Sequence, residues 1–411
     1  MRIENYFDLG GTPSFSGLFL ASGSFGLVNG DAEYSVTKEG EKTVYRYSGK
    51  GIELQAVFET VDKVCIRRDS IKNISGQEIE INDLVSRFCL DGNAYEIYTQ
   101  YNGWEHESEG AWQKLVTQIG VSAGGIRTCE GATPMMGFHN LLSNKNLVFH
   151  LIPNAQWQMT AKKVADSGRE KVVLEAGLCD KALRLKAAPG ETIELPTLVF
   201  FDAANKTDLD AYKLHEWYNK NYPRRTLPVI YNSWLYCYNN LNIEDLLRQV
   251  DCAAELGFEA FMIDAGWYGK GEDWSDCVGD WVENTVNGPR GRLIEISERV
   301  REKGMIFGLW FEPERASQKS YAVAEHPEFY IQKKFLDFAN PDAVNYMLET
   351  ISKQIDKYHI GWVKFDFNDA VLPLDPSGNG FYRYMKGQKD FILRLRERYP
   401  KLYITNCANA R

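Results

Sequence analysis

The sequence lacks the charge pattern and the long apolar runs that mark two large classes of protein. Its 47 lysines and arginines are outnumbered by 56 aspartates and glutamates, which leaves a net charge of −9. Because no basic cluster is present either, a nucleic-acid partner is excluded. No run approaches the roughly 18 apolar residues that would span a bilayer. Residues 1–8 lack the apolar core of a signal peptide, so we expect a cytoplasmic protein without a membrane partner.

Motifs for metal, nucleotide and serine chemistry are missing as well. The eight cysteines form no CxxC pair and no metal-finger spacing, so we expect reduced thiols. The six histidines include no pair at a ligand spacing such as HExxH, and no GxGxxG, Walker A or GxSxG motif occurs. We therefore expect no metal and no cofactor. Carboxylates, aromatic rings and amides remain, which are the groups that glycoside hydrolysis uses.

The first half of the chain has the pattern of an all-β domain. Short apolar or alternating runs, such as residues 54–61, are separated by turn signals from residue 14 to 203. Many strands without helical periodicity between them predict a β-sandwich over residues 1–205. Helical spacing over 208–222 then predicts a linker helix, which we place within residues 206–226.

From residue 227 to 411 apolar strands alternate with amphipathic helices. The predicted strands are 229–234, 260–264, 305–311, 361–367 and 402–405. Such tandem β/α units indicate parallel strands covered on both faces. Polar residues stand at the C-terminal ends of several strands, which favours a (β/α)8 barrel over a doubly wound sheet. Five strands cannot close an eight-stranded barrel, so we expect this chain to hold only the first part of one.

The strand that ends near Asp366 carries the most informative residues. Strand side chains alternate, so Trp362, Lys364, Asp366 and Asn368 share one face. Burying a cation, a carboxylate and an amide together is costly without a purpose. One interpretation is a structural ion pair between the lysine and the aspartate. The other is a carboxylate held ionised by the ammonium group, as a nucleophile or a metal ligand requires.

Two other strands end in carboxylates beside aromatic rings. Asp264 precedes Trp267, and a carboxylate next to a ring suits a sugar subsite, although Asp264 could instead cap the following loop. Trp310, Glu312 and Glu314 add an aromatic wall and two more carboxylates at the end of the third strand. For Glu314 we favour a bond to neighbouring backbone or cationic groups.

Several short stretches match one known family. FGLWFEPE at 307–314, VKFDFN at 363–368 and DAGWYG at 264–269 resemble motifs of the α-galactosidases of glycoside hydrolase family 36, the melibiases. Further ordered matches fall at 100–104, 133–138, 279–281, 326–329 and 336–341, so the resemblance covers most of the chain. It implies a multi-domain β + α/β fold, with an N-terminal β-supersandwich followed by a (β/α)8 barrel that is incomplete in this chain.

The resemblance also implies an activity, that of a retaining α-galactosidase acting on α-galactosides of oligosaccharides. Asp366 matches the aspartate of the family's KWD motif and would be the nucleophile that forms a covalent glycosyl-enzyme. Lys364 would bond a sugar hydroxyl and keep Asp366 ionised. The remaining predicted substrate-binding residues are Asp264, Trp267, Trp310, Asn368, Cys407 and Trp104. The implied partners are an oligosaccharide or glycoside substrate and, through homo-oligomer formation, further copies of the chain.

Two departures from the family pattern leave alternatives open. Ala265 stands where the family has a second aspartate, and losing a charged acceptor removes about 1.5–3 kcal/mol of hydrogen bonding. An α-N-acetylgalactosaminidase or another α-glycosidase of the same fold is therefore one alternative. No residue matches the family's general acid/base aspartate, so the other alternative is an inactive carbohydrate-binding fragment.

Overall fold

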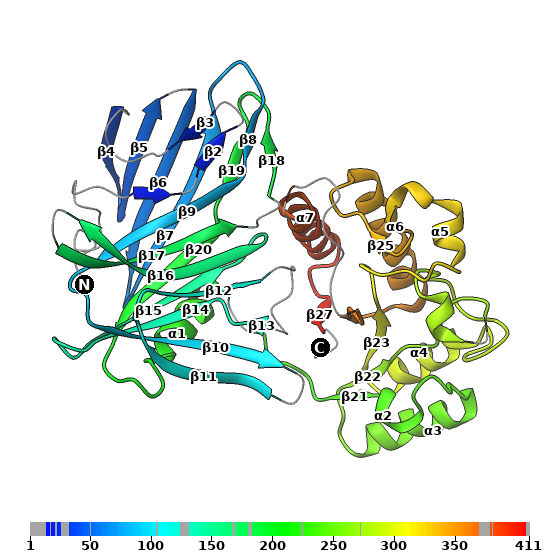
Figure 1. The fold of residues 1–411 in the computed structure, drawn as a ribbon. Helices are drawn as coiled ribbons and strands as arrows, with labels where there is room; N and C mark the ends of the chain where they lie inside the picture. Colours follow the sequence, from blue (N-terminus) through cyan, green and yellow to red (C-terminus); the bar gives the residue numbers. More distant parts are fainter. Residues whose placement is uncertain are drawn as a thin grey trace. The chain divides into compact units, whose positions relative to one another are not determined.

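A computed structural model describes most of the chain in two compact units. The first unit comprises residues 1–224 and 373–382, and the second comprises residues 225–372 and 383–411. The first is built mainly of strands and the second of alternating strands and helices (Figure 1). None of the helices in the described ranges combines the length and the apolar character needed to cross a membrane. The described residues are 14–16, 18–20, 23–25, 33–49, 51–103, 106–123, 131–166, 169–179, 183–222, 225–271, 273–369, 379 and 381–407.

The first unit contains two large antiparallel sheets. Its strands are β1 (Ser14–Ser16), β2 (Leu18–Leu20), β3 (Gly23–Phe25), β4 (Glu33–Glu39), β5 (Lys42–Gly49), β6 (Ile52–Val61), β7 (Val64–Asn73), β8 (Ile79–Ile81), β9 (Asp83–Leu90), β10 (Tyr95–Gly103), β11 (His106–Lys114), β12 (Gln118–Ala123), β13 (Gly131–Ala132), β14 (Met135–Asn140), β15 (Lys145–Ile152), β16 (Trp157–Asp166), β17 (Arg169–Cys179), β18 (Leu185–Ala187), β19 (Thr192–Glu194) and β20 (Thr197–Ala203). The larger sheet has the order β11-β10-β14-β15-β20-β7-β6-β5-β4, with β13 and β19 paired beside it, and the smaller has the order β1-β9-β17-β16-β12. The short pairs β18-β8 and β2-β3 complete the unit.

The core of the first unit lies between these two sheets. Along β6 buried and half-buried residues alternate, so the strand presents one face to the core. Phe88 from the smaller sheet packs edge-on against Phe149 and Phe200 from the larger sheet, with ring centroids 5.1 and 5.2 Å apart. The predicted sandwich of two facing sheets is therefore confirmed.

One helix packs on the first unit. α1 (Tyr212–Asn221) is shorter than the linker helix expected within 206–226. Leu209 and Asp210 have φ values of 51° and 50°, and left-handed residues do not continue into a right-handed helix. Trp217 is 5% exposed and packs with apolar residues of β7 and β20 on the outer face of the larger sheet. The helix is thus anchored to the sandwich by an apolar face.

The second unit is built on a parallel sheet. Its main strands have the order β21 (Ile230–Asn232), β22 (Ala260–Ile263), β23 (Ile306–Phe311), β26 (Trp362–Phe365) and β27 (Tyr403–Asn406). The pair β24 (Tyr330–Ile331) and β25 (Phe335–Leu336) lies outside this sheet. The helices are α2 (Trp234–Cys237), α3 (Ile243–Glu255), η2 (Trp274–Cys277), α4 (Leu293–Glu302), α5 (Tyr321–Glu325), η3 (Pro327–Phe329), α6 (Pro341–Tyr358) and α7 (Tyr382–Arg398).

Local sequence signals set where the helices begin. The Asn242 side chain accepts a hydrogen bond of 3.1 Å from the backbone N–H of Asp245 and caps α3. Asn340 caps α6 in the same way, and Pro341 occupies its first position, where no N–H is needed. α4 packs against β23 and lies between α3 and α6 (Figure 1). These helices cover one face of the parallel sheet.

The two faces of the parallel sheet differ in the way a barrel requires. One face is buried under helices and carries large apolar side chains, such as those of Phe261, Phe307 and Val363. On the other face Ala260, Met262 and Trp362 form an apolar layer with residues of the neighbouring strands. Inward layers of this kind are typical of the interior of a (β/α)8 barrel. The curled parallel sheet confirms the predicted fold class, with five barrel strands among the described residues.

Candidate active site

The layer above this apolar layer, toward the C-terminal ends of the strands, is polar. Strand alternation brings Asn232, Asp264, Trp310 and Lys364 to the same face, one from each of four neighbouring strands or the residue just after. Trp310 and Lys364 are register partners across β23 and β26. Four residues separated widely in the sequence therefore meet at one end of the sheet, where a barrel places its active site.

Asp264 is the most tightly held carboxylate of this layer. It is 3% exposed, and its Oδ2 accepts hydrogen bonds of 2.8 Å from Lys364 Nζ and from Asn232 Nδ2. Its Oδ1 accepts the backbone N–H of Ala265 at 2.9 Å, and its own N–H donates to Ser233 Oγ at 3.1 Å. These contacts fix both the position and the orientation of the carboxylate.

Lys364 forms its ion pair with Asp264. Burial works against the charge of the lysine, but the attraction and the hydrogen bond of Asp264 outweigh it and raise the pKa of Lys364, with smaller contributions from Cys407 and Asp366. The sequence-based hypothesis paired the lysine with Asp366, two residues away on the same strand. The structure differs because the next strand but one places Asp264 within 2.8 Å of the ammonium group.

Asp366 follows β26 directly and is 7% exposed. Its Oδ2 accepts a hydrogen bond of 3.0 Å from Trp310 Nε1, and its Oδ1 accepts the N–H of Phe367 at 2.8 Å. Its own N–H donates to the Phe311 carbonyl at 2.9 Å and so continues the parallel ladder. One donor on each oxygen fixes the plane of the carboxylate, and each oxygen keeps a further acceptor site.

The two predicted tryptophans have different places in the structure. Trp310 carries the donor to Asp366, and Tyr268 stacks on its ring with centroids 5.7 Å apart. Trp267 has no exposed surface, and its Nε1 donates to the Trp310 carbonyl at 2.8 Å. The prediction that Trp267 contacts substrate does not fit this placement, because its ring packs behind Trp310 against Trp281 and Phe311. Trp267 supports the wall of the site.

The two glutamates after β23 both hold neighbouring groups. Glu312 is fully buried and forms two hydrogen bonds of 2.8 Å with the Arg315 guanidinium. It also accepts the backbone N–H of Asn368, which anchors the segment that follows Asp366. Glu314 accepts the Tyr384 hydroxyl at 3.0 Å, in the kind of supporting role we favoured for it.

The other predicted residues lie at the same end of the sheet or outside the described ranges. Asn368 is half-buried two residues after Asp366. The N–H of Cys407 donates to the Phe365 carbonyl at 2.7 Å, and burial together with the nearby Asp366 raises the pKa of its thiol. Trp104 lies outside the described residues.

Three residues next to the site were given no substrate-binding role by sequence reasoning. Asn232 stands at a strand end, which was the available signal, and it bonds Asp264. Trp274 and Trp234 are partly exposed, and their rings extend from Trp310 with centroid separations of 6.2 and then 5.9 Å. Trp274 lies outside the five barrel strands, and Trp234 follows β21 although the predicted strand 229–234 included it. Within the described ranges, no three His, Cys, Asp or Glu side chains are grouped so that they could hold a metal ion.

Comparison with known proteins shows which proteins this chain is similar to. The chain is 29% identical over 261 residues to α-galactosidase Mel36A of Lactobacillus acidophilus, which is 58% of this chain and 36% of that protein. It is 29% identical over 243 residues to α-galactosidase AgaA of Geobacillus stearothermophilus, which is 54% of this chain and 33% of that protein. The chain thus aligns with about a third of the length of these curated relatives.

The fold and a family model agree with these relatives. The crystal structure of the α-galactosidase from Lactobacillus brevis superposes with a TM-score of 0.84 at 21% identity, covering 98% of this chain and 61% of that one. The family model described as melibiase matches residues 202–410, just over half of the chain. The resemblance seen in the sequence motifs is confirmed, and this chain belongs to the melibiase family.

Proposed function

We propose that the site around Asp366 is that of a retaining α-galactosidase that hydrolyses α-galactosides of oligosaccharides. The single observation that carries the proposal is the Asp366 carboxylate at the C-terminal end of β26, with one donor on each oxygen and the Lys364–Asp264 pair on the same face. The relatives named above are α-galactosidases. AgaA of Geobacillus stearothermophilus has been crystallised as variants with stachyose and with raffinose.

In this mechanism Asp366 is the nucleophile. One of its oxygens attacks the anomeric carbon while the glycosidic C–O bond breaks, and the departing oxygen takes a proton from a general acid. Water then attacks the glycosyl-enzyme and releases the sugar with its original anomeric configuration. Trp310 and the Phe367 amide hold the carboxylate in one plane throughout, so the attacking oxygen needs no reorientation. Among the described residues we assign no general acid.

The Lys364–Asp264 pair would hold the sugar ring. Asp264 accepts hydrogen bonds from hydroxyl groups, and the lysine ammonium, bonded to Asp264 among the described residues, has further N–H donors for neighbouring hydroxyls. The partly exposed rings of Trp234 and Trp274 supply apolar surface for the less polar face of a sugar.

Covalent trapping tests this proposal. The full chain is incubated with 2,4-dinitrophenyl α-galactoside, whose leaving group departs without a general acid, and is examined by intact-mass and peptide mass spectrometry. We expect a hexosyl adduct on Asp366, no adduct with Asp366→Asn, and an unchanged adduct with Asp390→Asn, an exposed aspartate on α7. An adduct on another residue, or no adduct with the native chain, would contradict the assignment of Asp366.

One observation bears on which sugar is bound. Ala265 beside Asp264 is 1% exposed, so a buried methyl group takes the place of a second carboxylate at this strand end. This favours testing α-N-acetylgalactosaminides as a second candidate substrate class. Rates measured with a panel of aryl α-glycosides separate the two, and binding without turnover of any member would indicate a carbohydrate-binding protein that lacks catalysis.

A further inference from the structure

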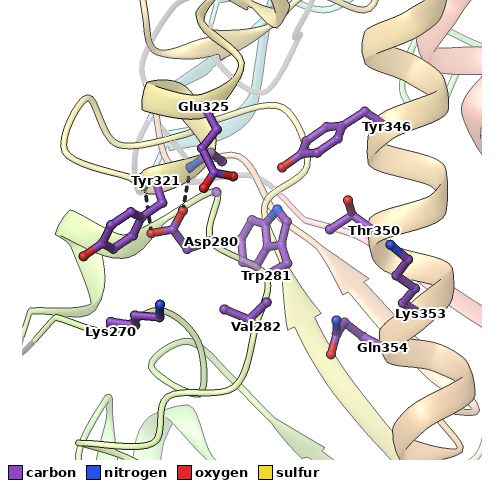
Figure 2. Close-up of a pocket in the computed structure, with 12 residues that line it drawn as sticks. Lys270, Asp280, Trp281, Val282, Tyr321, Glu325, Tyr346, Thr350, Lys353 and Gln354 are labelled. Atoms are coloured by element: carbon purple, nitrogen blue, oxygen red, sulfur yellow. Dashed lines mark hydrogen bonds between the residues drawn. The ribbon is translucent and has the colours of Figure 1, made fainter.

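A cavity in the second unit has no part in the chemistry proposed above. Its volume is about 300 Å³, which lies at the small end of the range for ligand sites in proteins. It is formed by the loop 279–282, by the first residues of α5 and by one face of α6 (Figure 2). Along α6 the lining residues Tyr346, Thr350, Lys353 and Gln354 follow helical spacing, so a single face of the helix is turned to the cavity.

The floor of the cavity offers a carboxylate. Asp280 is 8% exposed, and its two oxygens accept the backbone N–H groups of Tyr321 at 3.2 Å and Ala322 at 2.9 Å (Figure 2). Burial raises the pKa of Asp280 in spite of these two bonds, and the nearby Glu325 adds to the rise. Each oxygen of a carboxylate has two acceptor sites, so Asp280 can take further donors from a bound molecule.

The lining contains a glutamine amide and one buried donor that has no partner in the described part of the chain. Gln354 lines the cavity and is 8% exposed. Trp281 is 1% exposed, and its Nε1 lacks a partner among the described residues. Buried polar groups nearly always have a partner, and leaving one unpaired costs about 1–3 kcal/mol. Gln354, Asp280, Thr350 and Lys353 give the cavity a polar lining, which suits a polar occupant (Figure 2).

The charges around the cavity select the kind of occupant. Lys270 and Lys353 contribute two positive charges, and Asp280 and Glu325 two negative ones. A phosphate or a carboxylate would be repelled by the two acidic side chains, and a cation would be repelled by the two lysines. Balanced charge, paired donors and acceptors, and the rim ring of Tyr321 suit a neutral molecule with many hydroxyl groups.

We propose that this cavity binds a neutral monosaccharide unit at a site separate from Asp366. Hydroxyl groups of the sugar donate to Asp280 and exchange hydrogen bonds with the Gln354 amide. Trp281 joins the two regions, because its ring also packs against Trp310 with centroids 5.9 Å apart. The proposal does not depend on the catalytic role given to Asp366.

Indole N–H signals provide the test. The full chain, with its 10 tryptophans labelled with nitrogen-15, is titrated with methyl α-galactoside and methyl α-glucoside, and Trp281→Phe identifies the reporter signal. We expect a saturable shift of the Trp281 signal that persists in Asp264→Asn, which impairs the other site. Gln354→Met should weaken the binding roughly tenfold, since it removes the amide and keeps the length of the side chain.

Controls keep the proposal open to disproof. Gln318→Met makes the same change at an exposed glutamine outside the lining and should leave the titration unchanged. Thr350→Val, an almost isosteric change on the α6 face, should also weaken binding if Gln354→Met fails to fold. No saturable shift with either sugar, a shift abolished by Asp264→Asn, or a shift with inorganic phosphate instead of sugars would each overturn the proposal.

Discussion

Each unit of this molecule buries an ion pair, and the two pairs differ in what surrounds them. In the sandwich, Arg67 and Asp69 are each about 1% exposed and lie 2.8 Å apart. Ser86 donates to Asp69, Arg67 donates to the Arg87 carbonyl at 2.7 Å, and the ring of Phe88 covers the guanidinium. A hydroxyl, a backbone carbonyl and an aromatic ring of the protein therefore enclose this pair.

The pair at the end of the parallel sheet is partly open. The Lys364 side chain is 19% exposed, against 4% for Asp264, and the ammonium group has donors left over for a ligand. Both pairs have the same separation of 2.8 Å, so distance does not distinguish them. A binding pair therefore differs from a structural pair in the hydrogen-bonding capacity that its charged groups have left, and not in burial alone.

Breaking the enclosed pair should have the largest effect on stability. Arg67→Met leaves Asp69 buried without its cation, which we expect to cost about 3–5 kcal/mol of unfolding free energy. Urea unfolding followed by circular dichroism measures it. Arg68→Met, next in the chain but exposed and paired with Glu59, should cost less than about 1 kcal/mol. Equal losses for the two variants would contradict the comparison.

Breaking the open pair should mainly affect activity. Lys364→Met removes a donor to the sugar and a charge beside Asp264, so we expect kcat/KM for an aryl α-galactoside to fall roughly 100-fold. Expressed as a free energy, this fall in kcat/KM should be larger than the loss of unfolding free energy, since the lysine is not enclosed. Lys386→Met, an exposed lysine on α7, serves as the control. An unchanged kcat/KM with a large loss of stability would make this pair structural as well.

Removing the indole donor to Asp366 should have a smaller effect. Trp310→Phe keeps a ring in the wall but deletes the 3.0 Å hydrogen bond to Oδ2, and we expect a fall of roughly tenfold in kcat. Trp217→Phe is a matched control in the first unit, because its Nε1 has no partner in the described structure. Equal kcat values for wild type and Trp310→Phe would remove this hydrogen bond from the mechanism.

A surface cluster of three charged residues should show the smallest effect, and this effect should depend on pH. Hydrogen bonds from Arg299 and Lys303 lower the pKa of Asp251 from 3.8 to about 2. A lowered pKa in the folded state stabilises the protein above pH 4, and this contribution is lost as the pH falls toward 2. Asp251→Asn should therefore lose slightly more stability at pH 6 than at pH 2, measured by thermal unfolding. The same loss at both pH values would show that the attraction between Asp251 and the two cations is fully screened by solvent.

Much of the fold and part of the site could be predicted from the sequence. Alternation along 361–368 placed Lys364 and Asp366 on one face, and strand-end positions pointed to Asp264. The partner of Lys364 could not be predicted, because Asp264 lies 100 residues earlier and the two meet only through the register of the parallel strands. Trp267 followed Asp264 in a motif that suggested a sugar contact, yet packing turned it into the interior.

By itself the sequence determined the hydrophobic periodicity of the strands and helices, the polar ends of the barrel strands and membership of the family. These features depend on neighbours in the chain, whose side chains alternate or recur with a fixed period. Only the tertiary structure decided that Lys364 pairs with Asp264, that Trp310 holds Asp366, and that Asp280 and Gln354 line one cavity. Those contacts join residues on different strands, loops and helices. Their distances are fixed by strand pairing and side-chain packing, which the hydrophobic periodicity of the sequence does not encode.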